Sequence, residues 1–225
     1  MYRCIAVSVE GFVQQLAVSY LRHGYWFYVS GWVPTEKDPR AVDEKLVATY
    51  DLDITKWARA WRKAQGRASV QYLRCDRFFL LLATHGEHLF FERELKQIRD
   101  ARRAPIKYAG YSVSYRGTHP HVRIEQGEYL RRKAYLEELA RHWSGDIVAG
   151  ELAKLPFEPY APVRGQLLSL WRAVNRVRLE RGFELVPKRV LRLERRIVRP
   201  FGALELEAPL LAAHDIDRNA PEPSG

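Results

Sequence analysis

The chain has 225 residues, of which 47% are apolar, so it has enough hydrophobic side chains for a packed core and is not expected to be disordered. Lysine and arginine outnumber aspartate and glutamate by 37 to 27, and the formal net charge of +10 favours an anionic partner, most commonly nucleic acid. The two cysteines form no CxxC pair, which excludes a disulfide framework and a cysteine-rich zinc module and favours a reducing, cytoplasmic location.

Strands and helices are predicted to alternate in the first 50 residues. Glu10 interrupts the apolar run at the start, so no signal peptide is expected, and no stretch approaches the roughly 18 apolar residues that a membrane span needs. Asp38 is typical of a helix cap, and Gly24 is typical of a helix end. The predicted elements are a strand over residues 2–10, a helix over 12–24, a strand over 25–34 and a helix over 38–50.

A further helix is predicted over residues 53–66, with Asp53 as its cap. The residues expected on its core-facing stripe are Ile54, Trp57, Ala58 and Trp61. The basic residues that fall mostly on its other side are Lys56, Arg59, Arg62 and Lys63. A positive face of this kind can follow a phosphate backbone, although a solvated surface helix gives the same pattern.

The chain is predicted to be mostly β-structure from residue 68 to residue 125. The expected strands cover residues 69–74, 77–84 and 88–94, and a hairpin pairs 106–116 with 119–125. Together with the earlier elements, they indicate an α+β fold: a mainly antiparallel sheet with packed helices, followed by an Arg-rich helical C-terminal region.

The C-terminal part is predicted to be helical over residues 128–143 and 163–182, with a proline-containing connector over 155–165. Between residues 161 and 202 the chain has ten arginines and one lysine against three glutamates. Arginine binds phosphate through two parallel hydrogen bonds, so this is the densest predicted phosphate-binding region. The predicted divisions are an α+β domain over 1–150, the Arg-rich region over 151–205 and a tail over 206–225.

His119 and His121 are the most specific candidate site residues. Two residues apart on a strand, they share one face with Arg123, while Val122 and Ile124 fall on the opposite, core-facing side with Pro120. Two imidazoles on one face can share a divalent cation at about 2.1 Å each.

Residues 116–139 resemble the HUH endonuclease superfamily, in which two histidines separated by one residue lie on a strand and a helix with tyrosines follows. That superfamily includes rolling-circle replication initiators, relaxases and single-strand transposases of plasmids and mobile elements. The resemblance implies that Mg²⁺ or Mn²⁺, held by both histidines and a third ligand, polarises a phosphate of single-stranded DNA. A tyrosine then attacks and forms a 5′-phosphotyrosine. The candidate third ligands are Glu87 and His88, from a neighbouring turn.

Helix geometry ranks the two candidate nucleophiles. His121 lies about 13 Å before the end of its strand at 3.3 Å per residue. If the helix folds back from Gly127, Tyr135 returns about 12 Å at 1.5 Å per residue and lies level with His121, whereas Tyr129 returns only about 3 Å. Tyr135 is therefore the preferred nucleophile, and Tyr129 is more typical of a packing residue.

Two alternatives to cleavage stay open. One is a non-catalytic protein that binds DNA or RNA through a basic surface, and the other is a basic subunit of a protein or ribonucleoprotein assembly. The predicted nucleic-acid contacts are Lys56, Arg59, Arg62, Lys63, Arg102, Arg103, Arg116, Arg123, Arg131, Arg164, Arg172, Arg176, Arg178, Arg195 and Arg196. The sequence does not specify the oligomeric state.

Overall fold

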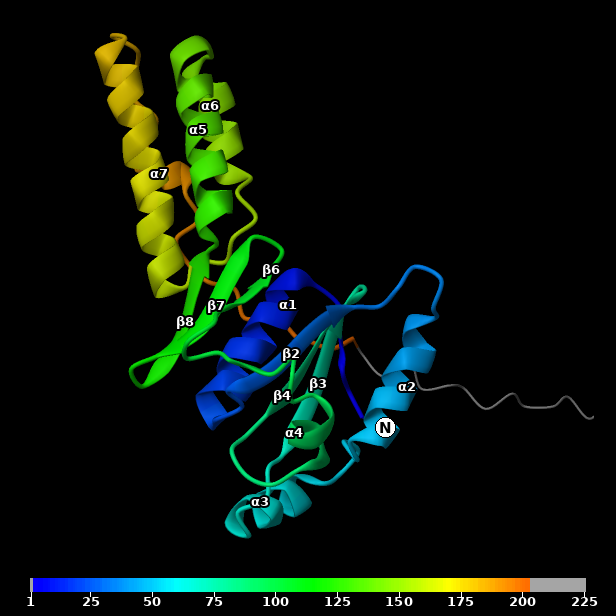
Figure 1. Ribbon diagram of the computed structural model, residues 1–225. Helices are drawn as coiled ribbons and strands as arrows, with labels where there is room; N and C mark the ends of the chain where they lie inside the picture. The colour runs from blue at the N-terminus through cyan, green and yellow to red at the C-terminus, as the bar shows by residue number, and fades with distance from the viewer. Residues whose placement is uncertain (1, 203–225) are drawn as a thin grey trace, which may run out of the picture.

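The computed structural model describes residues 2–202, and they form the predicted α+β fold (Figure 1). The predicted tail over 206–225 lies outside the described residues. Five strands pair in the order β1-β3-β4-β2-β5, with β1 parallel to β3 and the other pairs antiparallel. Their bounds are β1 Ile5–Ala6, β2 Phe27–Trp32, β3 Val70–Cys75, β4 Phe78–Ala83 and β5 Arg99–Asp100. All six residues of the central strand β4 are apolar, in keeping with a sheet that is covered on both faces.

Helical segments cover the two faces of this sheet. On one face, α1 (Val9–Gln14) continues through a π-helical segment (Gln15–Tyr20) and a 3-10 turn (Leu21–His23). This run ends at Gly24, whose φ of 92° satisfies the predicted stop. On the other face lie α2 (Pro39–Thr49), capped by Asp38 as predicted, and the short α4 (Leu89–Arg93).

The strand predicted over residues 88–94 is wrong, because α4 occupies this stretch. His88 caps the helix, and its Nδ1 accepts a hydrogen bond from the backbone N–H of Phe90 at 3.0 Å. Phe90 is buried against Tyr50 from the end of α2. The aromatic residues that favour a strand locally are therefore used for packing between helices and sheet.

A second, antiparallel sheet consists of β6 (Ile106–Tyr108), β7 (Tyr111–Arg116) and β8 (His119–Ile124). The single strand predicted over residues 106–116 is divided by a tight turn at Ala109 and Gly110, whose φ values of 45° and 79° are typical of a type I′ turn.

Three helices follow the second sheet: α5 (Gln126–His142), α6 (Gly145–Ala153) and α7 (Ala161–Glu180). Helix α6 was not predicted, and the division expected at residue 150 falls inside it. The start of α7 covers the free edge of β8, where the Gln166 amide bonds the backbone N–H and carbonyl of Ile124 at 2.8 and 3.1 Å. One hydrophobic core joins these helices to the second sheet, α1 and one face of the first sheet.

The returning chain after α7 contains a short 3-10 turn, η3 (Lys188–Val190), and reaches back to the first sheet. Backbone groups of Val198 exchange two hydrogen bonds with the Gln14 side chain, at 2.7 and 3.2 Å, and the Pro200 carbonyl accepts from Val7 N–H. No helix within residues 2–202 combines the length and apolar character needed to cross a membrane.

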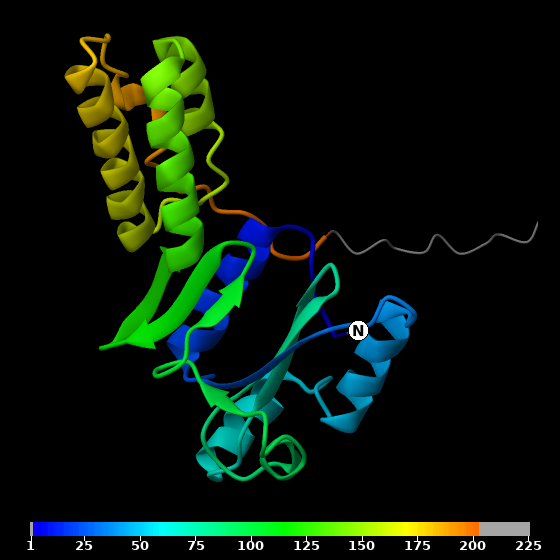
Figure 2. The ribbon, with the colours of Figure 1, turned by 45° about the horizontal axis from the view of Figure 1, so that its top comes forward.

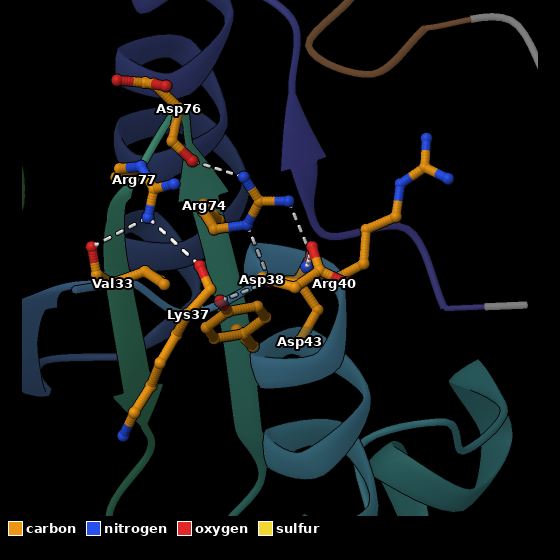
Figure 3. Close-up of polar contacts among 9 residues, drawn as sticks. Val33, Lys37, Asp38, Arg40, Asp43, Arg74, Asp76 and Arg77 are labelled. Carbon is orange, nitrogen blue, oxygen red and sulfur yellow. Dashed lines mark hydrogen bonds and ion pairs between the residues drawn. The ribbon is translucent and has the colours of Figure 1, made fainter. Parts of the chain in front are cut away.

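A buried ion pair fixes α2 to the first sheet (Figure 3). Arg74 of β3 meets Asp43 of α2 through two bonds of 2.7 Å, from Nε and Nη2 to the two carboxylate oxygens. The Tyr72 hydroxyl donates to the same carboxylate at 2.6 Å, and burial together with this bond raises the pKa of Tyr72. Nearby, the Arg77 guanidinium donates to the Pro34 carbonyl at 2.6 Å.

Candidate nucleic-acid interface

The two histidines of β8 share one face, as predicted, since Val122 and Ile124 are buried on the other side. His119 is exposed, and His121 is half-buried with an Nδ1 atom that has no hydrogen-bond partner among the described residues. Burial, and then the charges of Arg116 and Arg123, lower the pKa of His121. Its imidazole is therefore neutral near pH 7, which is the form that binds metal ions.

The two predicted third metal ligands lie in a different part of the molecule from the histidines of β8. Glu87 and His88 line a cavity of about 250 Å³ together with Asp51, Arg62 and Arg67, and no residue of β8 lines it. Burial, and then the charge of Arg62, lower the pKa of His88. Over residues 2–202, no group of three or more His, Cys, Asp and Glu side chains is positioned to hold a metal ion.

The expected return of α5 across the second sheet is wrong. Figures 1 and 2 show α5 leading away from β8, and only Glu125 separates the strand from the helix, which leaves no loop to reverse the chain. The Tyr135 hydroxyl donates to Glu151 of α6 at 3.2 Å, and the Tyr129 hydroxyl donates to Ser169 of α7 at 3.0 Å. Both tyrosine oxygens therefore lie among the helices rather than beside the histidines.

Helix α3 (Lys56–Ala64) carries the two tryptophans of its predicted apolar stripe on the outside, whereas Ile54 and Ala58 are partly buried. Trp57 is 85% exposed and Trp61 is 59% exposed, so the expectation that they face the core is wrong. Ala60 and Ala64 share this exposed side. We call Trp57, Ala60, Trp61 and Ala64 the tryptophan face.

Polar contacts explain the orientation of α3. The cap is Thr55, whose hydroxyl accepts from Ala58 N–H at 3.1 Å, and not Asp53. Arg62 is partly buried and pairs with the surface carboxylate of Asp51, and Arg59 is partly buried on the same side. Helical periodicity predicts which residues share a face but not which face is inside. The exposed cations beside the tryptophan face are Lys56 and Lys63.

The arginines around the β7–β8 hairpin differ in their freedom to bind a ligand. Arg102 forms a two-bond pair with Asp100, at 2.9 and 2.7 Å, and lies over the Trp26 ring at 4.5 Å. Arg123 is half-buried on β8. Arg102, Arg103 and Arg116 are all exposed, but the Arg102 guanidinium is held by Asp100.

Arg178 is not a surface residue, which corrects its prediction as a nucleic-acid contact. Its guanidinium is buried and donates to the Glu184 carbonyl at 2.6 Å and to the Trp143 carbonyl at 3.0 Å. These bonds join the end of α5 to the chain after α7. Arg178 therefore has a structural role in the helical region.

The other predicted C-terminal contacts are exposed. Arg131 pairs with Glu128, and Arg176 pairs with Glu137 at 3.4 Å. Arg195 lies over the Tyr160 ring at 5.0 Å. The remaining exposed arginines of this group are Arg164, Arg172 and Arg196.

Searches against models of known protein families and against curated proteins found no match to this chain. The HUH resemblance of residues 116–139 therefore stays a prediction from those residues alone. Sequence reasoning missed the exposure of Trp57 and Trp61, although their spacing beside four basic residues was visible.

Proposed function

We propose that this protein binds single-stranded nucleic acid through α3, with bases stacking on Trp57 and Trp61 and phosphates contacting Lys56 and Lys63. The observation that carries the proposal is the exposure of two tryptophans, 85% and 59%, four residues apart on one side of a helix. A chain with a net charge of +10 attracts the phosphate backbone over a longer range.

The chemistry of α3 suits an unpaired strand better than a duplex. Bases of a single strand present their flat faces, and stacking on an aromatic side chain contributes about 1–3 kcal/mol per base. The two tryptophans are about 6 Å apart along the helix axis, roughly twice the 3.4 Å between successive nucleotides of a stacked strand. Single-stranded DNA is the first ligand to test, and RNA is the second.

The arrangement of the tyrosines favours binding over cleavage. An HUH-type reaction needs a tyrosine oxygen at a metal held by His119 and His121. The hydroxyls of Tyr129 and Tyr135 are bonded to Ser169 and Glu151 within the helical region, away from β8. We further propose that the protein acts in the reducing cytoplasm, since both of its cysteines are unpaired and buried.

Fluorescence anisotropy with a labelled 15-nucleotide oligo(dT) tests the tryptophan face. The double variant Trp57→Ala/Trp61→Ala is expected to lose affinity by at least tenfold, since the loss of even one stacked base corresponds to about that factor. Trp143→Ala is the matched control, because this tryptophan is similarly exposed at the end of α5 and should leave affinity unchanged.

Two outcomes would contradict the proposal. One is an equal loss of affinity in the control variant. The other is that the double variant keeps its affinity for oligo(dT) but loses binding to vesicles of anionic phospholipid, since an amphipathic helix with tryptophan and lysine also suits a membrane surface. Salt titration adds a check: Lys56→Gln/Lys63→Gln should reduce the slope of log K against log[salt] by about 1.4.

A further inference from the structure

A cavity with an aromatic wall lies where the two sheets meet. Its volume is about 280 Å³, near the lower limit for small-ligand sites, so it suits a ligand no larger than one nucleotide. Trp32 and Phe78 contribute from the first sheet, and the β6–β7 turn and the start of α5 contribute the rest. The strand that follows α3 begins at Val70, which pairs with Ala83 at one end of β4. The cavity lies at the other end of β4, beside Phe78 and Trp32, about 17 Å from Val70 along the strands.

The aromatic wall of this cavity has packed rings on its inner side and an accessible indole on its outer side. Phe78 and Tyr108 are stacked, with ring centroids 4.4 Å apart and an interplanar angle of 9°. Trp32 meets Phe78 edge-on at 5.2 Å and 60°. Phe78 is buried, whereas Trp32 is 62% exposed, so its indole is available to stack on a planar ligand.

The charges around the cavity are arranged with the cations outermost. Lys107 pairs with Glu125 at 2.9 Å, and the exposed side-chain fractions are 63% for the lysine and 24% for the glutamate. Arg131 pairs with Glu128, and the corresponding fractions are 78% and 13%. A ligand that enters from solvent therefore meets the ammonium and guanidinium groups first, and these groups favour an anion such as phosphate.

The β6–β7 turn gives the cavity a narrow backbone wall. Gly110 has a φ of 79°, and a Cβ atom there would come within 3.1 Å of the Phe157 ring and 3.2 Å of Glu128 Cγ. Ala109 has a φ of 45°, a left-handed backbone conformation that costs free energy for residues other than glycine. The type I′ turn requires both values, and both residues line the cavity.

We propose that this cavity is a nucleotide-binding site, in which the base stacks on Trp32 and the phosphate binds Arg131 and Lys107. The nucleotide is either free or the end of a nucleic-acid strand, since both present the same base and phosphate. This site does not depend on the tryptophan face, because the two lie at opposite ends of the strands of the first sheet.

Isothermal titration of the full chain with AMP and UMP tests the site. Binding in the submillimolar to millimolar range is expected, and Trp32→Ala should weaken it at least tenfold, while Trp32→Phe should stay within about threefold because it keeps an aromatic ring. Arg131→Gln should weaken AMP binding but leave adenosine binding unchanged, since only AMP carries the phosphate. Trp143→Ala is the matched control: this tryptophan is also exposed but lies outside both proposed sites, so the variant should bind AMP as the wild-type chain does.

The source of the nucleotide is separated by comparing AMP with oligonucleotides that carry either a 5′-phosphate or a 5′-hydroxyl. Tighter binding of AMP indicates a free nucleotide, and tighter binding of the 5′-phosphorylated strand indicates a strand end. The proposal is overturned if neither ligand class binds at 5 mM, if Trp32→Ala binds unchanged, or if tetramethylammonium binds in place of AMP, which would indicate an aromatic site for cations.

Discussion

Removal of the Asp43 carboxylate is expected to destabilise the fold severely. Asp43 and Arg74 are both buried and share two bonds of 2.7 Å, and the Tyr72 hydroxyl donates to the same carboxylate. In Asp43→Ala the guanidinium stays buried without its counter-charge, a change that typically costs about 3–5 kcal/mol. Because whole domains are stable by only about 5–15 kcal/mol, this variant should lose a large part of its free energy of unfolding.

Urea unfolding followed by circular dichroism measures this loss. Asp38→Ala is the control on the same helix: its carboxylate accepts one bond from Arg40 N–H at 3.1 Å, and loss of such a cap costs about 1 kcal/mol. The triple variant Asp43→Leu/Arg74→Met/Tyr72→Phe should recover most of the stability, because neither an unpaired charge nor an unpaired hydroxyl remains. A loss of unfolding free energy in Asp43→Ala no larger than that in Asp38→Ala would show that the buried ion pair does not stabilise the fold.

The remaining predictions concern His88, Tyr135 and Arg178. Burial lowers the pKa of His88 in the fold, so the stability that His88 contributes is complete above about pH 6.5 and is lost as the pH falls through the lowered value. His88→Asn keeps a cap, and its free energy of unfolding should fall less steeply than that of the wild type between pH 7 and 5. An equally steep fall in the variant would count against this role of His88. Wild type and Tyr135→Phe should both give no covalent adduct with single-stranded DNA and Mn²⁺ on a denaturing gel, and an adduct lost in the variant would restore the cleavage hypothesis. Arg178→Ala should lower the free energy of unfolding by about 2–4 kcal/mol because two carbonyls lose charged donors, whereas the exposed Arg172→Ala should change it by less than about 0.5 kcal/mol in thermal unfolding.

Local signals were sufficient for much of the fold. The cap at Asp38, the stop at Gly24 and the apolar runs of β3 and β4 each depend on neighbouring residues, and the structure has them where they were predicted. The α+β class follows from such elements. Phe90 is an exception, since its local preference for a strand is overridden by the His88 cap and burial against Tyr50.

The candidate site depended on the path of α5 and the orientation of α3, which no local sequence pattern specifies. The shared face of His119 and His121 follows from strand periodicity, but the path of α5 depends on packing against α7, which buries Leu136 on the helical side. Similarly, the position of Trp57 outside the core accompanies the partial burial of Arg59 and Arg62 on the other side of α3. Distances between elements therefore required the tertiary structure.

The inward polar side of α3 has a consequence for its local stability. None of the nine side chains of this helix is fully buried, and its Arg62–Asp51 ion pair is weakened by salt. Such a segment opens at a lower free energy than the strands beneath it, so its amide protons should exchange with solvent early. A nucleic-acid strand bound to the tryptophan face would protect these amides from exchange. The affinity for nucleic acid therefore depends on the opening equilibrium of α3 as well as on the direct contacts. Added salt then weakens binding twice, by screening the phosphates and by releasing the helix that presents the tryptophans.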